Sequence, residues 1–414
     1  MAEHITSVVD RKIAVSQEDV LFAAQASPLK QETVFRTASL EHYVNAPIPD
    51  RVTHLWRYSD PTLFFPEAAP RRSTQNEGAL TVIASQEALD AAGVHPVPLH
   101  LSKEGLALLG KAVPSSHGLF EALNGALFTE SIFIRVPRGV VLDTPIQIVH
   151  RADRTGAVDR VVVTLESGAS ADVVEIFEDG SENARAVSVS ELFVGENASL
   201  RHAIVQQWEP KTRGFVTVRA AVERDGLFRE TSLALGGTTY KCDLGADLRG
   251  VGAQSEIIGV SFADKKQHMD FHTVQQHSAE RTHSQIRFKT ALGGKADSAY
   301  TGLIRIAEEA ALSEAFQDSR SLMLSDKAHS HAIPELEILT NDVQCSHAAA
   351  ASPIDDNELF YLMSRGIAAV EARRILVRGF FNDALSKIPM PLREQAAAAL
   401  EERLKRTFKE EETK

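Results

Sequence analysis

The chain has 414 residues, a formal net charge of −12 and two cysteines. A net negative charge argues against a nucleic-acid partner, because nucleic acids attract basic surfaces. Two cysteines are too few for a disulfide framework. No apolar run approaches the roughly 18–20 residues that cross a bilayer, which argues against a membrane-spanning helix. The N-terminal stretch 1–12 lacks the apolar segment of a signal peptide, so the sequence predicts a cytoplasmic protein without a membrane partner.

Residues 1–125 are predicted to form a mixed, partly helical region. The composition of 37–47 indicates a helix that ends before Pro47. A second helix is predicted over 114–127, with Ser115 or Ser116 as its N-cap. Several prolines between the two helices interrupt regular structure.

Residues 126–353 consist of short β-rich runs, many of which alternate apolar and polar side chains. Helix-length segments between the runs are missing, which argues against βαβ units. Small-residue turns recur at 167–170, 195–199, 224–227 and 250–254, in steps of about 26 to 29 residues. A period of this length favours the stacked coils of a β-solenoid, with a β-sandwich of irregular turns as the alternative.

From residue 354 to 414 the pattern becomes helical. Asp355 and Glu358 match a capping box, and Gly366 suits the C′ position after a helix. The next predicted helix, 368–388, carries a broad apolar face that either docks a partner or packs within the domain. A third helix completes the region.

A cysteine and a histidine stand two residues apart in QCSH (344–347), where strands give way to helices. If this segment is a strand, Val343, Cys345 and His347 share one face. A thiolate and an imidazole at this spacing can bind one iron or zinc ion, but a complete site needs further ligands from elsewhere in the chain or from a partner. The alternative is a buried cysteine that packs as a small apolar residue beside a hydrogen-bonded histidine.

Two other groups of histidines invite a metal interpretation. The four histidines between 268 and 284 cannot all face one side of a strand, so polar ladders within a solenoid are the better prediction. The segment HSHAIPE (329–335) resembles half of a cupin metal motif, but the glycine expected before it and the second half are missing. A stand-alone metal-dependent β-fold enzyme that uses His329, His331 and Glu335 is therefore the alternative function. A β-helix carbohydrate-active protein is a third possibility, against which the missing signal peptide counts.

Four stretches, in order, are similar to the SufB/SufD family of iron–sulfur cluster assembly proteins, and the similarity covers most of the chain. These stretches are LWRYSDPTLF (55–64), 120–148, 300–328 and 344–367. The chain resembles the SufD branch of the family, because Ala328 stands where SufB has a cysteine and because the Cys-Ser-His triplet is kept. It departs from the common SufD pattern at Ala348, where a glycine is usual, so the local turn is expected to differ.

The resemblance implies a mainly β fold, with a right-handed parallel β-helix core (126–353) between an N-terminal mixed region (1–125) and a C-terminal helical domain (354–414). It also implies a non-catalytic scaffold subunit that pairs with a SufB-like paralogue. His347 and Cys345 would hold iron or a transient iron–sulfur cluster at the shared interface.

The resemblance implies a second partner, a SufC-like ABC-type ATPase. This agrees with the sequence, which has no P-loop: in KTALGGKAD (289–297) a lysine occupies the position of the first glycine, so no nucleotide is expected on this chain. The expected docking residues for the ATPase are Leu362, Arg365, Gly366 and Phe380. In isolation the chain is expected to be able to form a homodimer through the surface that would bind SufB, since an unpaired sheet edge can pair with the edge of another chain.

Overall fold

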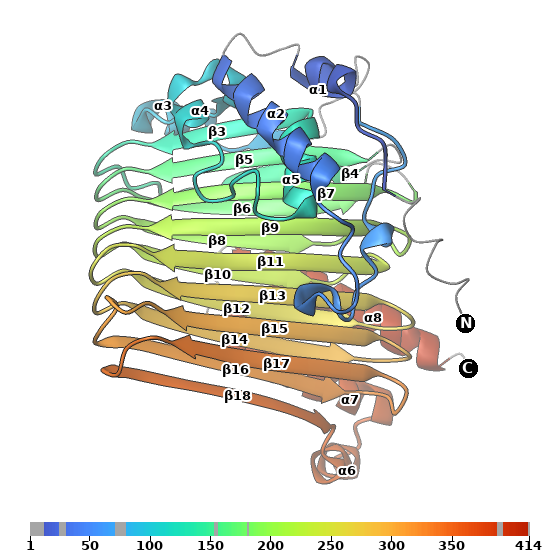
Figure 1. Cartoon of the computed structure of the whole chain (residues 1–414). Helices are drawn as coiled ribbons and strands as arrows, with labels where there is room; N and C mark the ends of the chain where they lie inside the picture. The colour runs from blue at the N-terminus through green and yellow to red at the C-terminus, as the bar shows by residue number, and fades with distance from the viewer. Residues whose placement is uncertain are drawn as a thin grey trace.

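The computed structural model describes residues 12–24, 30–70, 80–152, 156–179, 182–386 and 392–412. Within these residues the centre of the molecule is a parallel β-solenoid of two nine-stranded sheets, and successive strands alternate between the sheets (Figure 1). This confirms the solenoid and decides against the sandwich. The stretch 1–11, on which the argument against a signal peptide depends, lies outside the described residues.

From β3 on, the two sheets share one pattern, in which each strand pairs in parallel with the strand two positions further along the chain. Sheet A has the order β1 (Leu80–Ile83), β4 (Ile146–Ala152), β6 (Ser170–Asp179), β8 (Ser199–Gln206), β10 (Leu227–Ala234), β12 (Gln254–Ala263), β14 (His283–Leu292), β16 (Ser313–Met323), β18 (Val343–Pro353). Sheet B has the order β17 (His329–Ile338), β15 (Asp297–Ile306), β13 (His268–His277), β11 (Thr239–Leu248), β9 (Arg213–Val222), β7 (Arg185–Val194), β5 (Ala157–Leu165), β3 (Glu130–Val136), β2 (Val97–Pro98).

One coil takes from 26 residues, as in the pair Arg213–Thr239, to 32 residues, as in the pair Asp297–His329. The turns at one edge of the solenoid stack as a ladder of left-handed residues with φ between 53° and 75°. Each of their N–H groups donates to a carbonyl of the next coil; the residues are Gly139, Gly168, Asn197, Asp225, Gly252, Arg281 and Leu312. The predicted turns are therefore confirmed, and glycine, asparagine and aspartate dominate them because they tolerate this backbone conformation.

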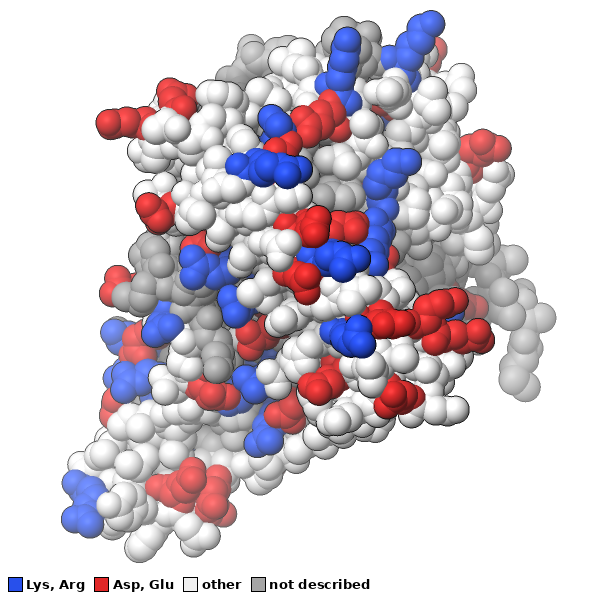
Figure 2. Space-filling model, turned by 90° about the vertical axis from the view of Figure 1, so that its left-hand side faces the viewer, with Lys and Arg blue, Asp and Glu red and all other residues white. Residues whose placement is uncertain are grey.

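Charged side chains of both signs intermingle over the face at this turn edge (Figure 2). The interior, in contrast, holds a large apolar cluster that extends from Leu80 to Ala328. An aromatic ladder runs through it with ring centroids 4.8 to 5.8 Å apart, formed by Phe177, Trp208, Tyr240, Phe271, Phe288 and Tyr300. Such contacts stabilise by about 0.5–1.5 kcal/mol each beyond burial, so they help to fix the stacking of the coils.

Helices cover the first coils. They are α1 (Gln17–Ala24), α2 (Lys30–Asn45), α3 (Gln86–Ala92), α4 (Lys103–Leu108), α5 (Leu119–Leu127) and the short 3-10 turns η2 (His54–Trp56), η3 (Pro61–Leu63) and η4 (Leu99–Leu101). The predicted helix before Pro47 is confirmed as part of the longer α2. The predicted caps Ser115 and Ser116 are wrong, because α5 begins after Gly118. The Glu191 carboxylate accepts hydrogen bonds from the backbone N–H groups of Gly110, Ala112 and Val113, in the segment that leads to α5.

Three helices follow the solenoid: α6 (Asp356–Ser364), α7 (Ala369–Ser386) and α8 (Leu392–Glu412). Asp355 caps α6 by accepting from the Asn357 N–H at 2.7 Å, and Gly366 follows that helix with a φ of 86°, as predicted. Helices α7 and α8 pack on the outer face of sheet A, where they share one apolar cluster with residues of the strands and α7 lies against β12 and β14. The apolar face of the predicted helix 368–388 is thus used largely within the chain. No helix among the described residues is long and apolar enough to cross a membrane.

Candidate metal-binding edge at the open end of the solenoid

The solenoid ends with two strands that have a neighbour on one side only. Strand β18 pairs with β16 and β17 pairs with β15, and no further strand of the described chain follows either (Figure 1). No residue of β17 or β18 is buried, and β18 is exposed from Ser346 to Pro353. We call these two strands the open end. Unpaired backbone groups along such an edge are a template for another strand.

His347 and Cys345 both lie on β18, which confirms that the segment is a strand. The register places Val343, Cys345 and His347 opposite Ser313, Ala315 and Gln317, whose side chains are buried. The three residues therefore share the face that continues the solenoid interior. Val343 and Cys345 pack against the last apolar cluster, around Ile304 and Ile306, whereas His347 is exposed.

Burial raises the pKa of the Cys345 thiol, and a hydrogen bond with the Ala315 backbone offsets only part of this effect. The group is therefore a thiol rather than a thiolate at neutral pH in the isolated chain. Among the described residues, no third histidine, cysteine or carboxylate joins Cys345 and His347 in a metal-sized group. A metal ion at this pair would therefore need further ligands from outside the described residues.

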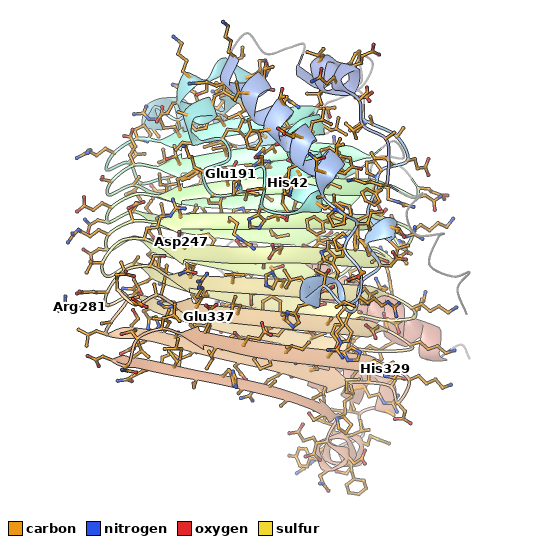
Figure 3. The ribbon with its side chains drawn as sticks, in the orientation of Figure 1. His42, Glu191, Asp247, Arg281, His329 and Glu337 are labelled. Atoms are coloured by element: carbon orange, nitrogen blue, oxygen red, sulfur yellow. The ribbon has the colours of Figure 1, made fainter. Side chains whose placement is uncertain are left out.

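The three residues of the cupin-like alternative do not form one site. They lie on the outer face of β17, and a strand rises about 3.3 Å per residue, so His329 and Glu335 are about 20 Å apart. Figure 3 labels His329 and Glu337 toward opposite ends of this strand. His331 and Glu335 have partners from the N-terminal region: the His331 ring stacks on Tyr58 at 4.3 Å, and Glu335 lies 3.3 Å from His54.

The four histidines between 268 and 284 form ladders, as predicted, rather than one metal site. His268 and His272 lie on the outer face of sheet B, where they contact Asp297 at 3.0 Å and Asp243 at 2.5 Å. His277 points inward and contacts Thr282 and Ser284. Burial is the main reason why its pKa is lowered to about 4, so it is neutral.

The residues expected to dock an ATPase lie at two places. Leu362, Arg365 and Gly366 belong to the elbow between α6 and α7, where α6 has no buried residue and exposes Phe360 and Tyr361. Phe380 lies instead on α7, half-buried in the cluster against sheet A, and its carbonyl accepts from Lys289 at 2.8 Å.

Sequence reasoning missed how the stretch 55–64 is used. It lies along the outer face of sheet B, where Trp56 stacks on Phe215 at 5.8 Å. Lys241 reaches from β11 to the Leu55 carbonyl at 2.8 Å and lies over the Trp56 ring. The aromatic residues beside a proline in this stretch indicate that it covers an apolar surface. They do not indicate which surface that is.

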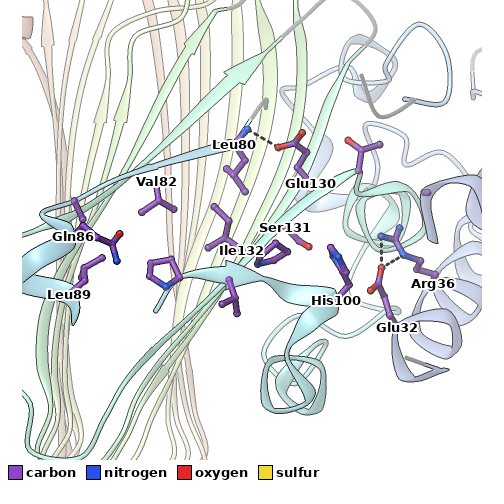
Figure 4. A pocket seen from close by; sticks show the side chains of 16 residues that line it. Glu32, Arg36, Leu80, Val82, Gln86, Leu89, His100, Glu130, Ser131 and Ile132 are labelled. Carbon is purple, nitrogen blue, oxygen red and sulfur yellow. Dashed lines mark hydrogen bonds and ion pairs between the residues drawn. The ribbon is translucent and has the colours of Figure 1, made fainter. Parts of the chain in front are cut away.

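The opposite end of the solenoid holds a pocket of about 350 Å³ between the N-terminal helices and strands β1 to β3 (Figure 4). Its walls mix apolar and polar side chains, and one side carries the buried ion pair Glu32–Arg36, at 2.7 Å. The Arg36 guanidinium also donates to the carbonyls of Ala126 and Phe128. The Arg36 guanidinium therefore helps to hold α2 against α5.

Fold and site together define a class: a two-sheeted parallel β-solenoid whose first coil is capped and whose last coil presents an unpaired edge with a histidine and a cysteine. The family model for the SufBD core domain of SUF system iron–sulfur cluster assembly matches residues 148–380. The chain belongs to this family.

Individual relatives agree. A protein of Mycobacterium tuberculosis named as an iron–sulfur cluster assembly SufBD family protein is 31% identical over 297 residues, which are 69% of this chain and 74% of that protein. The iron–sulfur cluster assembly protein SufB of Bacillus subtilis is 26% identical over 399 residues, or 86% of this chain and 85% of that protein. The relatives thus establish the SufB/SufD family without separating its two branches.

Proposed function

We propose that this chain is a SufD-like scaffold subunit that builds iron–sulfur clusters together with a SufB-like paralogue and a SufC-like ATPase, in the cytoplasm. The observation that carries the proposal is the open end, because a strand of eleven residues that is paired on one side only bears two side chains able to bind iron, His347 and Cys345. The iron or cluster is the cargo of this site, and the chain itself turns over no substrate.

The partner completes the site. A strand of the SufB-like subunit pairs with β18 and covers Cys345 and His347, and it brings the ligands that this chain lacks. Metal binding requires the deprotonated thiol and the neutral imidazole, so cargo binding weakens at low pH. Because burial raises the pKa of Cys345, its thiolate forms when the metal displaces the thiol proton.

The ATPase docks at the elbow formed by Leu362, Arg365 and Gly366. An exposed apolar helix with no buried residue supports this assignment, since Phe360 is 72% exposed. Phe380 contributes to ATPase docking only indirectly, by packing α7 on sheet A. Closure of paired ATPase subunits around nucleotide would pull on α6, which follows β18 directly in the chain, and so bias the open end between two arrangements.

The test is anaerobic cluster assembly on the purified three-protein complex, followed by visible absorption. His347→Ala should abolish or strongly reduce cluster formation while the complex still assembles. His283→Ala removes a partly exposed histidine from β14, which is separated from β18 by β16; it is the matched control and should behave as wild type. If the assembled H347A complex builds clusters normally, the site is wrongly assigned.

Size-exclusion chromatography of the isolated chain tests the edge separately. Without a partner, the same edge should allow homodimers, and equimolar SufB-like protein should convert them to heterodimers.

A further inference from the structure

A second group of metal-ligating side chains lies far from the open end, where α5 meets the outer face of sheet B. His117 precedes α5, Glu121 lies in its first turn, and Asp243 projects from β11. One ligand atom of each lies within 4.8 Å of the others. Glu121 and Asp243 are 4% and 7% exposed, whereas the His117 side chain is 25% exposed and faces the solvent side.

The two carboxylates are held in place from several elements. Glu121 Oε1 accepts from Thr217 Oγ1 of β9 at 2.8 Å. A Cβ at Gly118 would lie 2.4 Å from Glu121 Oε2, so the glycine leaves room for this carboxylate. Asp243 Oδ1 lies 2.5 Å from His272 Nδ1, which fixes the carboxylate and leaves Oδ2 facing His117 at 3.5 Å.

One oxygen of Asp243 already has a cationic partner. The Arg219 guanidinium donates to Asp243 Oδ2 at 2.6 Å and so occupies the oxygen that a metal ion would use.

We propose that His117, Glu121 and Asp243 form a binding site for one divalent transition-metal ion, with His272 as the residue that orients Asp243. Ligand atoms around a four-coordinate ion with bonds of about 2.0–2.1 Å lie about 3.4 Å apart, so small side-chain rotations close the site. One imidazole and two carboxylates suit Fe²⁺, Co²⁺ or Zn²⁺, whereas Mg²⁺ and Ca²⁺ prefer oxygen ligands alone. The partly exposed His117 provides the entry path, and binding displaces Arg219 from Asp243.

This site does not depend on the proposed function at the open end, and the experiment keeps the two apart. The full chain carries Cys345→Ser and His347→Ala, so that metal binding at the open end does not contribute. Co²⁺ is titrated into chelator-treated protein and followed by visible absorption and calorimetry. One Co²⁺ should bind per chain, Zn²⁺ should displace it, and excess Mg²⁺ should not.

Two variants remove a ligand without removing the fold. Glu121→Gln keeps the volume and the acceptor for Thr217, and His117 is partly exposed, so both Glu121→Gln and His117→Ala should melt close to the parent chain. Each should weaken Co²⁺ binding at least about tenfold, the scale on which even outer partners of a metal site act. His283→Ala is the control and should not change the affinity.

Arg219→Met should have the opposite effect on Co²⁺ affinity. It frees Asp243 Oδ2 and removes a positive charge, so Co²⁺ should bind more tightly than to the parent chain. A network that only ties α5 to sheet B would bind no Co²⁺ in any of these proteins. The proposal is overturned if saturable binding is missing at millimolar Co²⁺, if the ligand variants bind like the parent, or if Mg²⁺ competes equally.

Discussion

The two ends of the solenoid are built on opposite principles. At the N-terminal end, β1 pairs antiparallel with β4, β2 pairs antiparallel with β3, and α2 to α5 cover the first coils. At the other end, β17 and β18 continue the parallel ladder and stop without a cap (Figure 1). An unpaired edge is a template for another strand, so we expect association at the open end rather than at the capped end.

The interior follows the same division. Toward the capped end, a buried ladder of charges crosses the coils from β4 to β10. His150 Nδ1 lies 3.0 Å from Asp159, and its Nε2 lies 2.8 Å from Glu175, although not aligned for a hydrogen bond. His202 bridges Glu175 at 2.8 Å and Glu230 at 2.6 Å. Toward the open end the inward polar groups are neutral, such as Gln317 and Ser330.

The largest expected effect comes from breaking this ladder. His202→Ala leaves Glu175 and Glu230 buried without their shared partner, which should cost about 3–5 kcal/mol of the free energy of unfolding. The measurement is denaturant unfolding, with His347→Ala as the same substitution at the open end. That control should change stability by less than about 0.5 kcal/mol, as for other exposed positions. Equal losses in the two variants would contradict the division between the ends.

The ladder also predicts how stability depends on pH. Burial alone would lower the pKa values of His150 and His202, but the neighbouring carboxylates outweigh it and raise them to about 9 and about 10. Both histidines are therefore charged in the folded state at pH values where the unfolded chain has lost these protons. Their stabilising contribution is complete below about pH 6.5 and is lost as the pH rises through 9 to 10.

Unfolding midpoints recorded from pH 6 to pH 10 test this dependence. The midpoint should fall across the range in wild type, and it should fall less steeply in His202→Ala, which retains only His150. A flat profile in wild type would mean that the two histidines are neutral in the fold.

The sequence predicts the solenoid better than it predicts what covers it. The turns at Gly168, Asn197, Asp225 and Gly252 are visible as small or polar residues because each must adopt a positive φ, a local requirement that a single residue reveals. The candidate site at the open end could be proposed from the sequence for a similar reason, since Cys345 and His347 are two residues apart in one strand.

Contacts between distant segments leave no such signal. Tyr58 stacks on His331, and His117 meets Asp243, only because the N-terminal region folds back along sheet B. The apolar face of 368–388 shows that a surface covers it without saying which one, and sheet A is the answer.

Association should be sensitive at one end only. Ala349 is exposed on β18 and faces the interior side of the open coil, opposite Ser319. Ala349→Lys places an uncompensated charge there, which natural edges use to prevent pairing, and should weaken binding of the SufB-like partner by at least about tenfold. Leu101→Lys is the matched change at the capped end, where Leu101 is 62% exposed. Surface-captured partner should bind this control with wild-type affinity; loss in both variants would place the interface elsewhere.

The smallest expected effect comes from removing one helix cap at each end of the solenoid. Asp355 caps α6 at the open end, and Ser85 caps α3 at the capped end by accepting from the Ala88 N–H. Replacing either residue by alanine costs the helix about 1 kcal/mol. The consequence differs, because α3 buries Leu89 in the solenoid core whereas α6 buries no residue.

Ser85→Ala should therefore lower the global unfolding free energy by about 1 kcal/mol, since α3 unfolds together with the core. Asp355→Ala should leave the midpoint unchanged and instead accelerate hydrogen exchange of the α6 amides by several-fold. If the SufC-like ATPase docks on α6, its addition should suppress this accelerated exchange, because the partner supplies the packing that the isolated helix lacks. If the ATPase leaves this exchange unchanged, its docking surface lies away from the elbow. If Asp355→Ala lowers the global unfolding midpoint, α6 unfolds together with the core and the expected difference between the two ends is wrong.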